Sequence, residues 1–522
     1  MKKTLLYSVS AIMLSFLFTN TISAQEGTLD ETFGIGGQIS NNFGGASHVM
    51  DAALQSDGKI IVIGTATPFE KSSKFVIVRY LPNGDLDSSF DRVGATTILG
   101  EKDFGAGAIA IQPDGKIVVV GTTENKVNGV SESDIMLIRY NEDGTLDSTF
   151  DGDGIATSPL KNSQSGSAIL LQADGKIIVG GTFSLNNPEL QTFGLARFNS
   201  DGSIDTTYGT NGFVQTPNMS RGVLKDIKFI DNENVIAVGY NLIISNFLMA
   251  KYDATGKVIT SFGSKGNGII EEKFNEIALL NKCVVSKDNH IYVAGASFNG
   301  TKYNVFIDKY DSNGVVDTSF GVNGRIVKEY GNTIASFGQD IAIDSKNELI
   351  VGLAVGPTSN YDFGLESYSL DGILNTSFGT NGYFSTNFGS GHDYFQKMLI
   401  QSDDKIVMIG QKYDQVIARV NNSKKVVLST DNFTVNSTVI NVSPNPVNEF
   451  PVLNLQLQKA TNLSVDLYDA KGILVSSLIK NKSYAEGSTA QVLNLSNNLA
   501  KGIYFLKVSS NGKLTKTIKI IK

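Results

Sequence analysis

One phrase recurs seven times along this chain, and its period constrains the fold more than any other feature. The copy at residues 141–154 reads NEDGTLDSTFDGDG: a polar turn with glycine, then Leu-Asp-x-x-Phe, then a second glycine turn. Self-similarity at a fixed period indicates a repeat architecture. At spacings of 57, 60, 58, 54, 58 and 58 residues, the copies end on Phe33, Phe90, Phe150, Tyr208, Phe262, Phe320 and Phe378.

Each repeat contains segments typical of four β-strands. In the first full repeat these are residues 48–55, 59–64 (KIIVIG), 75–80 (FVIVRY) and 95–99, and the middle two are rich in β-branched residues. The pair Asp57-Gly58 predicts a tight turn between the first two strands. Because no helical period interrupts these segments, each repeat is predicted to form one small antiparallel sheet.

The two ends of the array are incomplete in complementary ways. Residues 27–40 hold a marker phrase and a fourth strand without the first three, whereas the array ends near Val420 with three strands and no fourth. The N-terminal strand therefore completes the last sheet, as it does when a β-propeller closes into a ring. An open solenoid would instead need capping repeats at both ends. The predicted fold class is all-β, with a seven-bladed β-propeller closed by the N-terminal strand.

The recurring phrases DGKIxVxG and LDxSFG resemble those of the delta-60 repeat family over residues 27–421. The resemblance implies a seven-bladed propeller, and it implies no particular activity. Two repeats lose the Asp-Gly turn, at residues 231–233 and 345–347, and we interpret these departures as drift within the array.

Residues 1–24 are typical of a secretory signal peptide. Lys2 and Lys3 precede an apolar run over residues 5–18, and Thr-Ile-Ser-Ala at 21–24 fits a small-residue cleavage site. That run is too short to span a membrane as a helix, and no later segment is a better candidate. The protein is therefore expected to be secreted or held on the outer cell surface, without a transmembrane segment.

Charge and cysteine content exclude some classes of function. The net charge of −7 is spread along the chain and no basic face is evident, so nucleic acid is not expected as a partner. Cys283 is the single cysteine, which excludes an intramolecular disulfide, and its apolar surroundings predict a buried, inert thiol.

The repeat ends after Asn421, and the rest of the chain has a different pattern. The predicted domains are a signal peptide (1–24), the propeller (25–421), a polar linker (422–440) and a C-terminal unit (441–522). Alternating residues at 452–457, 463–468 and 503–508 predict that this last unit is a small Ig-like β-sandwich.

Four ordered motifs in this unit resemble the type A C-terminal sorting domain of the type IX secretion system. They are SPNP at 443–446, LYDAKG at 467–472, LAKGIY at 499–504 and KTIKIIK at 516–522. The resemblance implies a Bacteroidota-type cell, recognition of residues 441–522 by the type IX secretion machinery, passage across the outer membrane, and removal of the domain on export. An ordinary Ig-like module is the alternative.

Propellers commonly bind ligands on the face that carries the connections between second and third strands, and this expectation rests on fold analogy. These connections vary here, with loops expected at 65–74, 122–134 and 182–192 but only a short turn at 411–415. A variable face is typical of a recognition surface.

Aligning the seven first strands brings charged residues to one level. A ring of such groups at the channel mouth predicts either a polar ligand site with an acid/base pair or a hydrated channel whose charges pair with one another. The candidate residues at this level are Asp51, Asp226, Lys282, Asp340 and Lys397.

The histidines add a weaker hypothesis. His48 and His392 precede the first strands of repeats that become neighbours once the ring closes, so they could meet at the channel mouth. A metal pair there lacks a third ligand at suitable spacing.

The turns after the third strands suggest calcium as a possible cofactor. The pattern [D/N]-x-[D/N]-G-x-x-[D/N] places oxygen ligands at alternate positions around a glycine, as a hard cation requires. The same residues also favour plain turns, because their side chains accept hydrogen bonds from their own backbone. The candidate ligands are Asn141, Asp143, Asp147, Asn199, Asp201 and Asp205.

Three functions from different classes remain open, and a purely structural role in an extracellular matrix is the third of them. The first is a secreted or surface-displayed recognition or adhesion module that binds an unknown glycan or surface protein without turnover, because no catalytic constellation is found in the array. The alternative is an enzyme acting on polysaccharide, with the channel-mouth carboxylates as acid and base. Whether the chain is an enzyme stays uncertain at this point, with the sequence favouring no.

Overall fold

The computed structural model describes residues 25–43, 45–68, 74–92, 95–96, 104–127, 130–158, 164–184, 191–217, 219, 221–231, 233–273, 277–357, 360–422, 439–447, 450–457, 460–470, 473–495, 499–510 and 513–522. The chain divides into two compact units, Met1–Lys424 and Lys425–Lys522, and each is described by itself. The expected signal peptide and residues 423–438 of the expected linker lie outside the described residues. Within the described ranges, no helix is long and apolar enough to cross a membrane.

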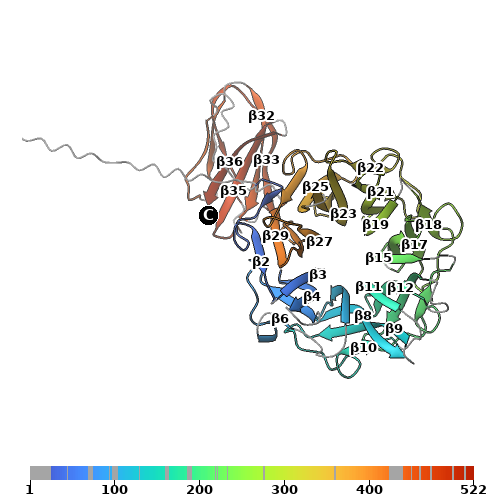
Figure 1. Ribbon diagram of the computed structural model, residues 1–522. Helices are drawn as coiled ribbons and strands as arrows, with labels where there is room; N and C mark the ends of the chain where they lie inside the picture. The colour runs from blue at the N-terminus through green and yellow to red at the C-terminus, as the bar shows by residue number, and fades with distance from the viewer. Residues whose placement is uncertain are drawn as a thin grey trace, which may run out of the picture. The chain divides into compact units, whose positions relative to one another are not determined.

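The larger unit consists of seven antiparallel sheets arranged in a ring around a central opening (Figure 1). The innermost strands are β3 (Gly45–Leu54), β7 (Phe104–Ile111), β11 (Gln164–Leu171), β15 (Gly222–Phe229), β19 (Ile277–Val285), β23 (Ile334–Ile343) and β27 (Tyr394–Ile400). Each innermost strand contacts the next around the ring, and β27 contacts β3. The predicted all-β, seven-bladed propeller is confirmed.

The second strands of the sheets carry the KIIVIG-type segments. They are β4 (Ile60–Pro68), β8 (Ile117–Val127), β12 (Ile177–Phe183), β16 (Val235–Asn241), β20 (Ile291–Phe298), β24 (Glu348–Pro357) and β28 (Ile406–Gln411). The third strands follow them in the same order. They are β5 (Lys74–Tyr80), β9 (Val130–Tyr140), β13 (Thr192–Phe198), β17 (Phe247–Tyr252), β21 (Tyr303–Tyr310), β25 (Asp362–Ser369) and β29 (Gln415–Asn421).

Six sheets have a short outer strand of their own. These strands are β6 (Ala95–Thr96), β10 (Ile155–Thr157), β14 (Phe213–Gln215), β18 (Ile269–Glu272), β22 (Arg325–Lys328) and β26 (Tyr383–Thr386), and the only helical segment described is the 3-10 turn η1 (Phe90–Arg92). In the seventh sheet, β1 (Thr28–Leu29) and β2 (Gln38–Asn41) from the N-terminus pair with β29. The expected closure by the N-terminal strand is therefore confirmed.

The repeated phrase recurs because it joins neighbouring sheets. Its final aromatic residue is almost wholly buried in every copy, for example Phe90 and Phe150 at 0% exposure. The glycine of the next repeat's polar turn lies against that ring: Gly144 has a φ of +90°, and a Cβ there would lie 2.9 Å from Phe90. Glycine is required at this position because both the positive φ and the close approach exclude a side chain.

The aspartate of the phrase anchors a cation cluster beside the aromatic ring. In the second sheet, Asp147 accepts from Arg139 Nε at 2.6 Å and from Lys116 Nζ at 2.9 Å. Arg139 lies 4.5 Å from the centroid of Phe150 and donates to the backbone carbonyl of Ser200, in the turn of the next sheet. Because the guanidinium binds a carboxylate, a ring and a carbonyl at once, each cluster fixes two sheets to each other.

Equivalent clusters occur in three other sheets. The triplets of arginine, lysine and aspartate are Arg79, Lys59 and Asp87; Arg197, Lys176 and Asp205; and Arg419, Lys405 and Asp30. In the last triplet the aspartate comes from the N-terminal segment, and Arg419 lies 4.6 Å from the centroid of Phe33. The same interaction that joins sheets along the chain therefore also closes the ring.

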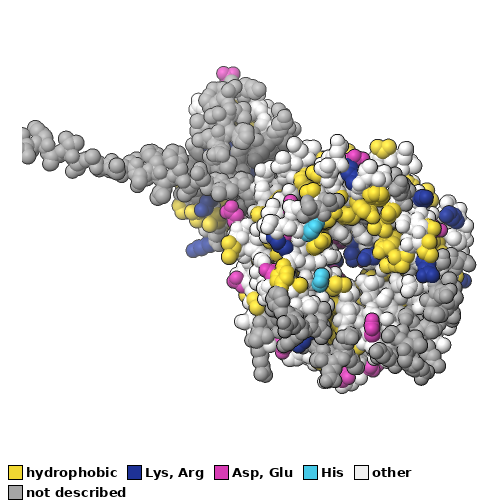
Figure 2. All heavy atoms as spheres, viewed as in Figure 1, with side chains coloured by type: hydrophobic (Ala, Val, Ile, Leu, Met, Phe, Trp, Pro, Cys, Tyr) yellow, Lys and Arg dark blue, Asp and Glu magenta, His cyan; other side chains and the backbone are white. Residues whose placement is uncertain are grey.

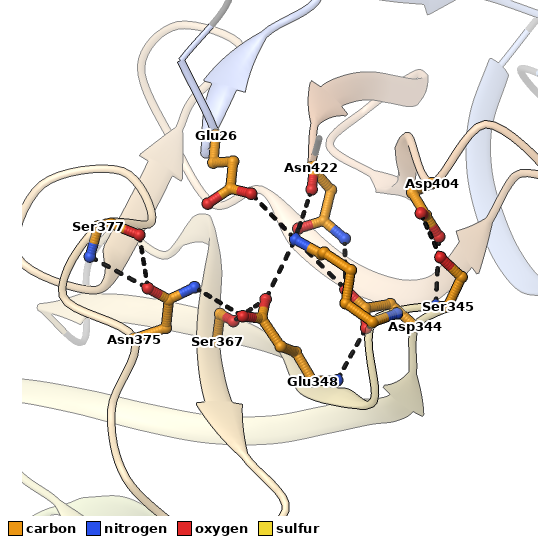
Figure 3. A network of polar contacts seen from close by, with 10 residues as sticks. Glu26, Asp344, Ser345, Glu348, Ser367, Asn375, Ser377, Asp404 and Asn422 are labelled. Carbon is orange, nitrogen blue, oxygen red and sulfur yellow. Dashed lines mark hydrogen bonds and ion pairs between the residues drawn. The ribbon is translucent and has the colours of Figure 1, made fainter. Parts of the chain in front are cut away.

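The sixth sheet replaces this cluster with a different one, shown in Figure 3. Glu348, Ser367 and Asn375 occupy the positions of the lysine, arginine and aspartate, and Glu348 accepts hydrogen bonds from the other two at 3.2 Å. Lys346, in the turn between β23 and β24, supplies the missing cation at 3.1 Å from Glu348. The departure at residues 345–347 is therefore compensated locally.

Lys346 also contacts both ends of the propeller. Its Nζ lies 3.0 Å from Glu26 and 2.7 Å from the carbonyl of Asn422, and both of these residues are buried. A further ion pair reaches Asp344 at 3.6 Å. One ammonium group thus binds the first and last residues of the ring to its sixth sheet (Figure 3).

The smaller unit is a sandwich of two antiparallel sheets. One contains β30 (Val439–Ser443), β31 (Val452–Leu457) and β34 (Gly487–Val492), and the other contains β33 (Leu474–Tyr484), β32 (Thr461–Asp469), β35 (Ile503–Ser510) and β36 (Lys513–Ile521). Residues from both sheets, such as Leu455 and Leu506, share one buried core. This arrangement agrees with the predicted Ig-like β-sandwich.

Replacing Lys346 with methionine is expected to loosen the ring closure. Because Glu26 and Asp344 would lose their shared cation while staying buried, the free energy of unfolding should fall by roughly 1–3 kcal/mol. The measurement is the urea midpoint, together with hydrogen exchange of the amides in β1 and β29. Lys287→Met is the matched control, since Lys287 is exposed in the equivalent turn of the fifth sheet. Equal midpoints for the two variants would contradict the closure role.

Acid should weaken the clusters between sheets, because their aspartates have lowered pKa values in the folded protein. Burial alone would raise the pKa of Asp30, but hydrogen bonds from Thr32 and Lys405 outweigh it and lower the pKa to about 2. In the same way, contacts with Thr149 and Lys116 outweigh burial and hold the pKa of Asp147 well below its usual range. A lowered pKa in the folded state stabilises the fold above the unfolded pKa, and this contribution is lost as pH falls.

We therefore expect the unfolding midpoint to fall as pH drops from about 4 to about 2. Asp147→Asn should lower the midpoint at neutral pH and reduce its change across this window. A wild-type midpoint that stays constant from pH 4 to pH 2 would show that these aspartates do not carry the stability assigned to them.

Candidate functional site

Every innermost strand of the ring contains a β-bulge at the same level. The register with the second strand shifts by one residue between Val49 and Asp51, and between Leu224 and Asp226. The other five strands shift at the equivalent place. A bulge re-aims side chains, because its extra residue has no partner on the paired strand. The bulged residues are Met50, Gly107, Ser167, Lys225, Asn281, Gln339 and Gln396.

The predicted ring of charges lies directly after these bulges, as the alignment indicated. The three aspartates nevertheless point between sheets, since Asp51, Asp226 and Asp340 are 9%, 4% and 5% exposed. Each accepts a hydrogen bond from a backbone N–H on the next innermost strand, as Asp340 does from Met398 at 2.8 Å. The equivalent donors to Asp51 and Asp226 are Ile109 and Cys283.

The lysines at this level neutralise the aspartates. Lys397 Nζ lies 3.3 Å from Asp51 and 3.8 Å from Asp340, and it is therefore shared by two sheets. Lys282 lies 3.7 Å from Asp226, which Lys228 also binds at 2.8 Å. Burial alone would raise the pKa of Asp226, but the two lysines outweigh it and lower the pKa to about 2. The three carboxylates are therefore anchors between sheets, bound by lysines and by backbone N–H groups.

Cys283 lies beside the same anchor. It is 1% exposed, and burial followed by the nearby Asp226 charge raises the pKa of its thiol far above the usual range. The thiol is therefore protonated and unreactive at neutral pH, as its apolar surroundings predicted.

The two candidate histidines, His48 and His392, lie on and just before innermost strands, β3 and β27. Figure 2 shows histidine side chains at two separate places. Nδ1 of His392 accepts from the backbone N–H of Tyr361 at 3.3 Å, whereas His48 lies on β3 and is exposed. Across the described residues, no group of three or more His, Cys, Asp or Glu side chains could hold a metal ion.

His392 belongs to a continuous row of rings that the sequence did not reveal. Successive ring centroids along the row are 5.1, 4.9, 5.6, 5.0 and 5.3 Å apart. We name this set the rim row, and its members are Phe298, Tyr303, Phe337, Tyr361, His392 and Tyr394. Five members are half-buried and Tyr394 is 43% exposed, so the row reaches solvent.

The rim row crosses the fifth, sixth and seventh sheets on one face of the ring. Phe298, Tyr303 and Tyr361 lie at connections between second and third strands, which is the face expected to recognise ligands. Tyr394 begins the innermost strand β27, and Phe337 lies within β23. On the same face, the turn between β16 and β17 exposes Leu242, Ile243 and Ile244 by 51%, 67% and 49%. Figure 2 shows hydrophobic side chains gathered along this side of the opening. Clustered exposed apolar groups of this kind mark interaction surfaces.

Two carboxyl groups lie next to the rim row. Asp393 is wholly buried and accepts from the backbone N–H of Phe388 at 2.8 Å, while its Oδ1 atom has no hydrogen-bond partner. Asp362 also has an unpartnered Oδ1 atom, and burial raises the pKa of both groups. The sequence signal was the density of aromatic and acidic residues at 361–363 and 392–395, which a single-repeat alignment does not highlight.

The candidate calcium turns form closed hydrogen-bonded structures. Asp143 Oδ1 accepts from the backbone N–H and the hydroxyl of Thr145 at 3.0 and 2.6 Å, and Asp201 accepts in the same way from Ser203. Asn141 donates to Thr145, and Asn199 donates to Ser203. The remaining candidates, Asp147 and Asp205, are bound by lysine and arginine.

One expected loop is wrong. Residues 122–134 continue β8 and β9, which pair as far as Val127 and Val130. Antiparallel hydrogen bonding can extend a hairpin past the apolar part of a sheet, so polar composition did not end the strands. The short turn at 411–415 is confirmed, with β28 ending at Gln411 and β29 beginning at Gln415.

The four motifs of the C-terminal unit meet in its larger sheet. Asn445 donates to the carbonyl of Lys519 at 2.9 Å and accepts from the N–H of Ile521 at 3.0 Å. Gly502 and Lys522 exchange backbone hydrogen bonds, and Asp469 pairs with Tyr504. Motifs far apart in sequence therefore form one structural feature.

The chain thus consists of a ring of repeated antiparallel sheets followed by a C-terminal sandwich. Comparisons with known families identify each of these two parts. Residues 55–90, 112–150, 172–208 and 287–320 match the family described as "Domain of unknown function (DUF5122) beta-propeller". Residues 441–522 match the "Secretion system C-terminal sorting domain". The chain carries DUF5122 propeller repeats followed by a type IX sorting domain, which implies export to the cell surface or beyond it.

Comparisons with individual proteins do not assign a function to this chain. No curated protein matches the chain. YCF48 from Cyanidioschyzon merolae has 10% identity and a TM-score of 0.42, over 73% of this chain and 98% of that chain. Hydrazine synthase from Kuenenia stuttgartiensis has 13% identity and a TM-score of 0.45, over 74% of this chain and 98% of that chain.

A third structure is PorZ, described as an essential surface component of the type-IX secretion system of Porphyromonas gingivalis. It has 12% identity and a TM-score of 0.28, over 91% of this chain and 70% of that chain. Likenesses this distant carry no inference about what the present chain binds.

Calcium removal is expected to leave the propeller unchanged. Because side-chain oxygens of the candidate turns already accept hydrogen bonds or bind cationic side chains, the melting temperature should be the same in millimolar calcium and in chelator. Differential scanning calorimetry measures this directly, with magnesium as the ionic-strength control. A higher melting temperature in calcium alone would establish a site in these turns.

Proposed function

We propose that this protein is a non-catalytic recognition or adhesion module, secreted or displayed on the outer surface of a Bacteroidota-type cell. The C-terminal unit directs the chain to the type IX secretion machinery, after a signal peptide at residues 1–24 has directed it across the inner membrane. The propeller then binds a glycan or a surface protein through the face that carries the rim row.

The rim row is the observation that carries this proposal. Aromatic rings present a large apolar area at low cost in conformational entropy, and rings at a partly exposed edge can stack on sugar faces or apolar side chains. Tyr361 and Tyr394 also keep hydroxyl groups that can hydrogen-bond to a polar ligand. The neighbouring apolar turn at Leu242–Ile244 extends the same surface.

The alternative, an enzyme on polysaccharide, would use the channel carboxylates as acid and base. Their environment does not favour that role, because Asp51, Asp226 and Asp340 are buried, bound by lysines and hydrogen-bonded to neighbouring strands. A general acid needs a raised pKa, whereas the pKa of Asp226 is lowered to about 2. This arrangement supports a binding module over the enzyme.

Alanine substitutions in the rim row should weaken ligand retention without unfolding the ring. Tyr361→Ala and Tyr394→Ala are each expected to reduce affinity roughly threefold to tenfold, the cost of losing one aromatic contact. The measurement is retention of polysaccharides and surface proteins by the chain from residue 25 onward, with the polymer mass determined before and after incubation. Ile373→Ala is the control, because Ile373 is 70% exposed in a turn after a third strand.

A shortened polymer would overturn the binding role and favour the enzyme. In that case Asp340→Asn should abolish the activity, whereas under our proposal it lowers only the melting temperature. Retention that is equal in the rim variants and the control would exclude the rim row as the binding surface.

A further inference from the structure

The innermost strands differ in charge from the rest of the molecule. The net charge of these strands is +1, whereas that of the whole chain is −7. The charged residues are four lysines (Lys225, Lys228, Lys282 and Lys397) and three aspartates (Asp51, Asp226 and Asp340). Three of the lysines lie on β15 and β19, beside the single carboxylate Asp226. The net charge of this sector of the channel wall is therefore +2, from three ammonium groups and one carboxylate.

Asp226 cannot neutralise all three ammonium groups. Both of its oxygens lie within 2.9 Å of Lys228 Nζ, and Oδ1 lies 3.7 Å from Lys282. Its Oδ2 atom also accepts the backbone N–H of Cys283 at 3.2 Å. In the described residues Lys225 forms no ion pair or hydrogen bond with an acidic group.

The bulge determines where Lys225 lies. It is the extra residue of β15, so it is half-buried on the innermost strand while the next residue, Asp226, is buried between sheets. Because sheets pack on both sides of β15, the partial exposure of Lys225 is to the channel. Burial and the nearby Lys282 charge lower the pKa of Lys225, in agreement with the lack of an acidic partner among the described residues.

Other innermost strands carry amide side chains at the level of Lys225. The bulged residues on β23 and β27 are Gln339 and Gln396, and both are half-buried. Figure 2 shows Lys or Arg atoms at the centre of the ring, within the hollow. A concave site lined by charges of one sign concentrates ions of the opposite sign.

The rim row lies one step above this level. Phe337 and Tyr394 precede the bulged residues Gln339 and Gln396 by two positions on their strands, a separation of about 7 Å along a strand. A ligand that extends from the rim by this distance reaches the level of the bulges, at which Lys225 also lies.

We propose that Lys225 and Lys282 form an oxyanion site in the channel, which takes a carboxylate, sulfate or phosphate group of the ligand. This inference rests on the proposed function only in that the ligand enters the channel from the rim. The chemistry of the site does not depend on the proposed function. The ammonium groups bind the oxyanion by charge-assisted hydrogen bonds, while Asp226 keeps Lys228 and Lys282 in place. The cost of holding an unpaired cation in the free protein is offset when the anion enters.

The test uses free anions, so that it does not depend on finding the natural ligand. The chain from residue 25 onward is titrated with sodium glucuronate and sodium sulfate, against sodium chloride of equal ionic strength and neutral glucose. Glucuronate and sulfate should raise the melting temperature saturably, by about 2 °C at tenfold excess over Kd. Chloride and glucose should give no saturable shift.

The variants Lys225→Met and Lys282→Met should lose this response, and Gln339→Met, at the same level without a charge, should keep it. Lys225→Met should also melt above the wild type without anion, because a desolvated like-charge contact has been removed. Selenate soaked into crystals should give anomalous density beside Lys225. An equal glucuronate response in wild type and Lys225→Met would overturn the oxyanion site.

The variants distinguish a failure of the oxyanion site from a failure of the proposed function. Tyr361→Ala should keep the response to free anions even where it loses ligand retention. Lys225→Met should keep retention of neutral polymers and lose only the preference for acidic ones. If neutral and acidic polymers are retained equally by the wild type, the site does not take part in recognition.

Discussion

The structure depends on the contact between an arginine, an aspartate and an aromatic ring at the outer part of four of its seven sheets. Neighbouring sheets of a propeller pack mainly through apolar side chains, which are strong but not directional. The guanidinium of Arg139 adds direction, because it binds Asp147 and Phe150 of its own repeat and a carbonyl of the next. It therefore fixes the angle between sheets as well as their separation, and the repeated phrase is the sequence form of this requirement.

Ring closure uses the same interaction between parts of the chain almost four hundred residues apart. Arg419 near the end of the propeller binds Asp30 near its beginning, at 2.8 Å. Next to this joint, the sixth sheet has exchanged its cation cluster for Glu348, Ser367 and Asn375, and Lys346 compensates by binding Glu26 and Asn422. The joint is thus held from two adjacent sheets. The last residues of the ring can bond correctly only when the first are present.

Much of this architecture could be predicted from the sequence, because repetition averages out local ambiguity. The incomplete but complementary ends of the repeat array predicted that the ring closes through the N-terminal strand. The alignment of first strands correctly placed five charged residues at one level: Asp51, Asp226, Asp340, Lys282 and Lys397. The alignment could not show that the aspartate side chains lie between sheets. A one-residue bulge reverses the direction of the following side chains without changing the sequence pattern. The rim row was missed because its six rings come from three repeats and meet only in the folded ring, although Phe337 and Tyr394 occupy equivalent positions. The marker aspartates seemed free to bind calcium because their arginine partners lie eight residues earlier, on a different strand.

The bulge in every innermost strand separates two neighbouring positions that would otherwise constrain each other. The residue after the bulge supports the joint between sheets, and several bulged residues do so as well. Ser167 Oγ donates to the carbonyl of Leu224, and Asn281 Nδ2 donates to that of Gly338, in each case on the next innermost strand. Gly107 leaves no room for a side chain, because a Cβ there would lie 2.1 Å from the carbonyl oxygen of Gly166. The bulged residues of the seven copies are Met50, Gly107, Ser167, Lys225, Asn281, Gln339 and Gln396. One backbone irregularity, inherited by every copy, therefore joins neighbouring strands by different means: close backbone approach in one copy, and a hydroxyl or an amide hydrogen bond in others.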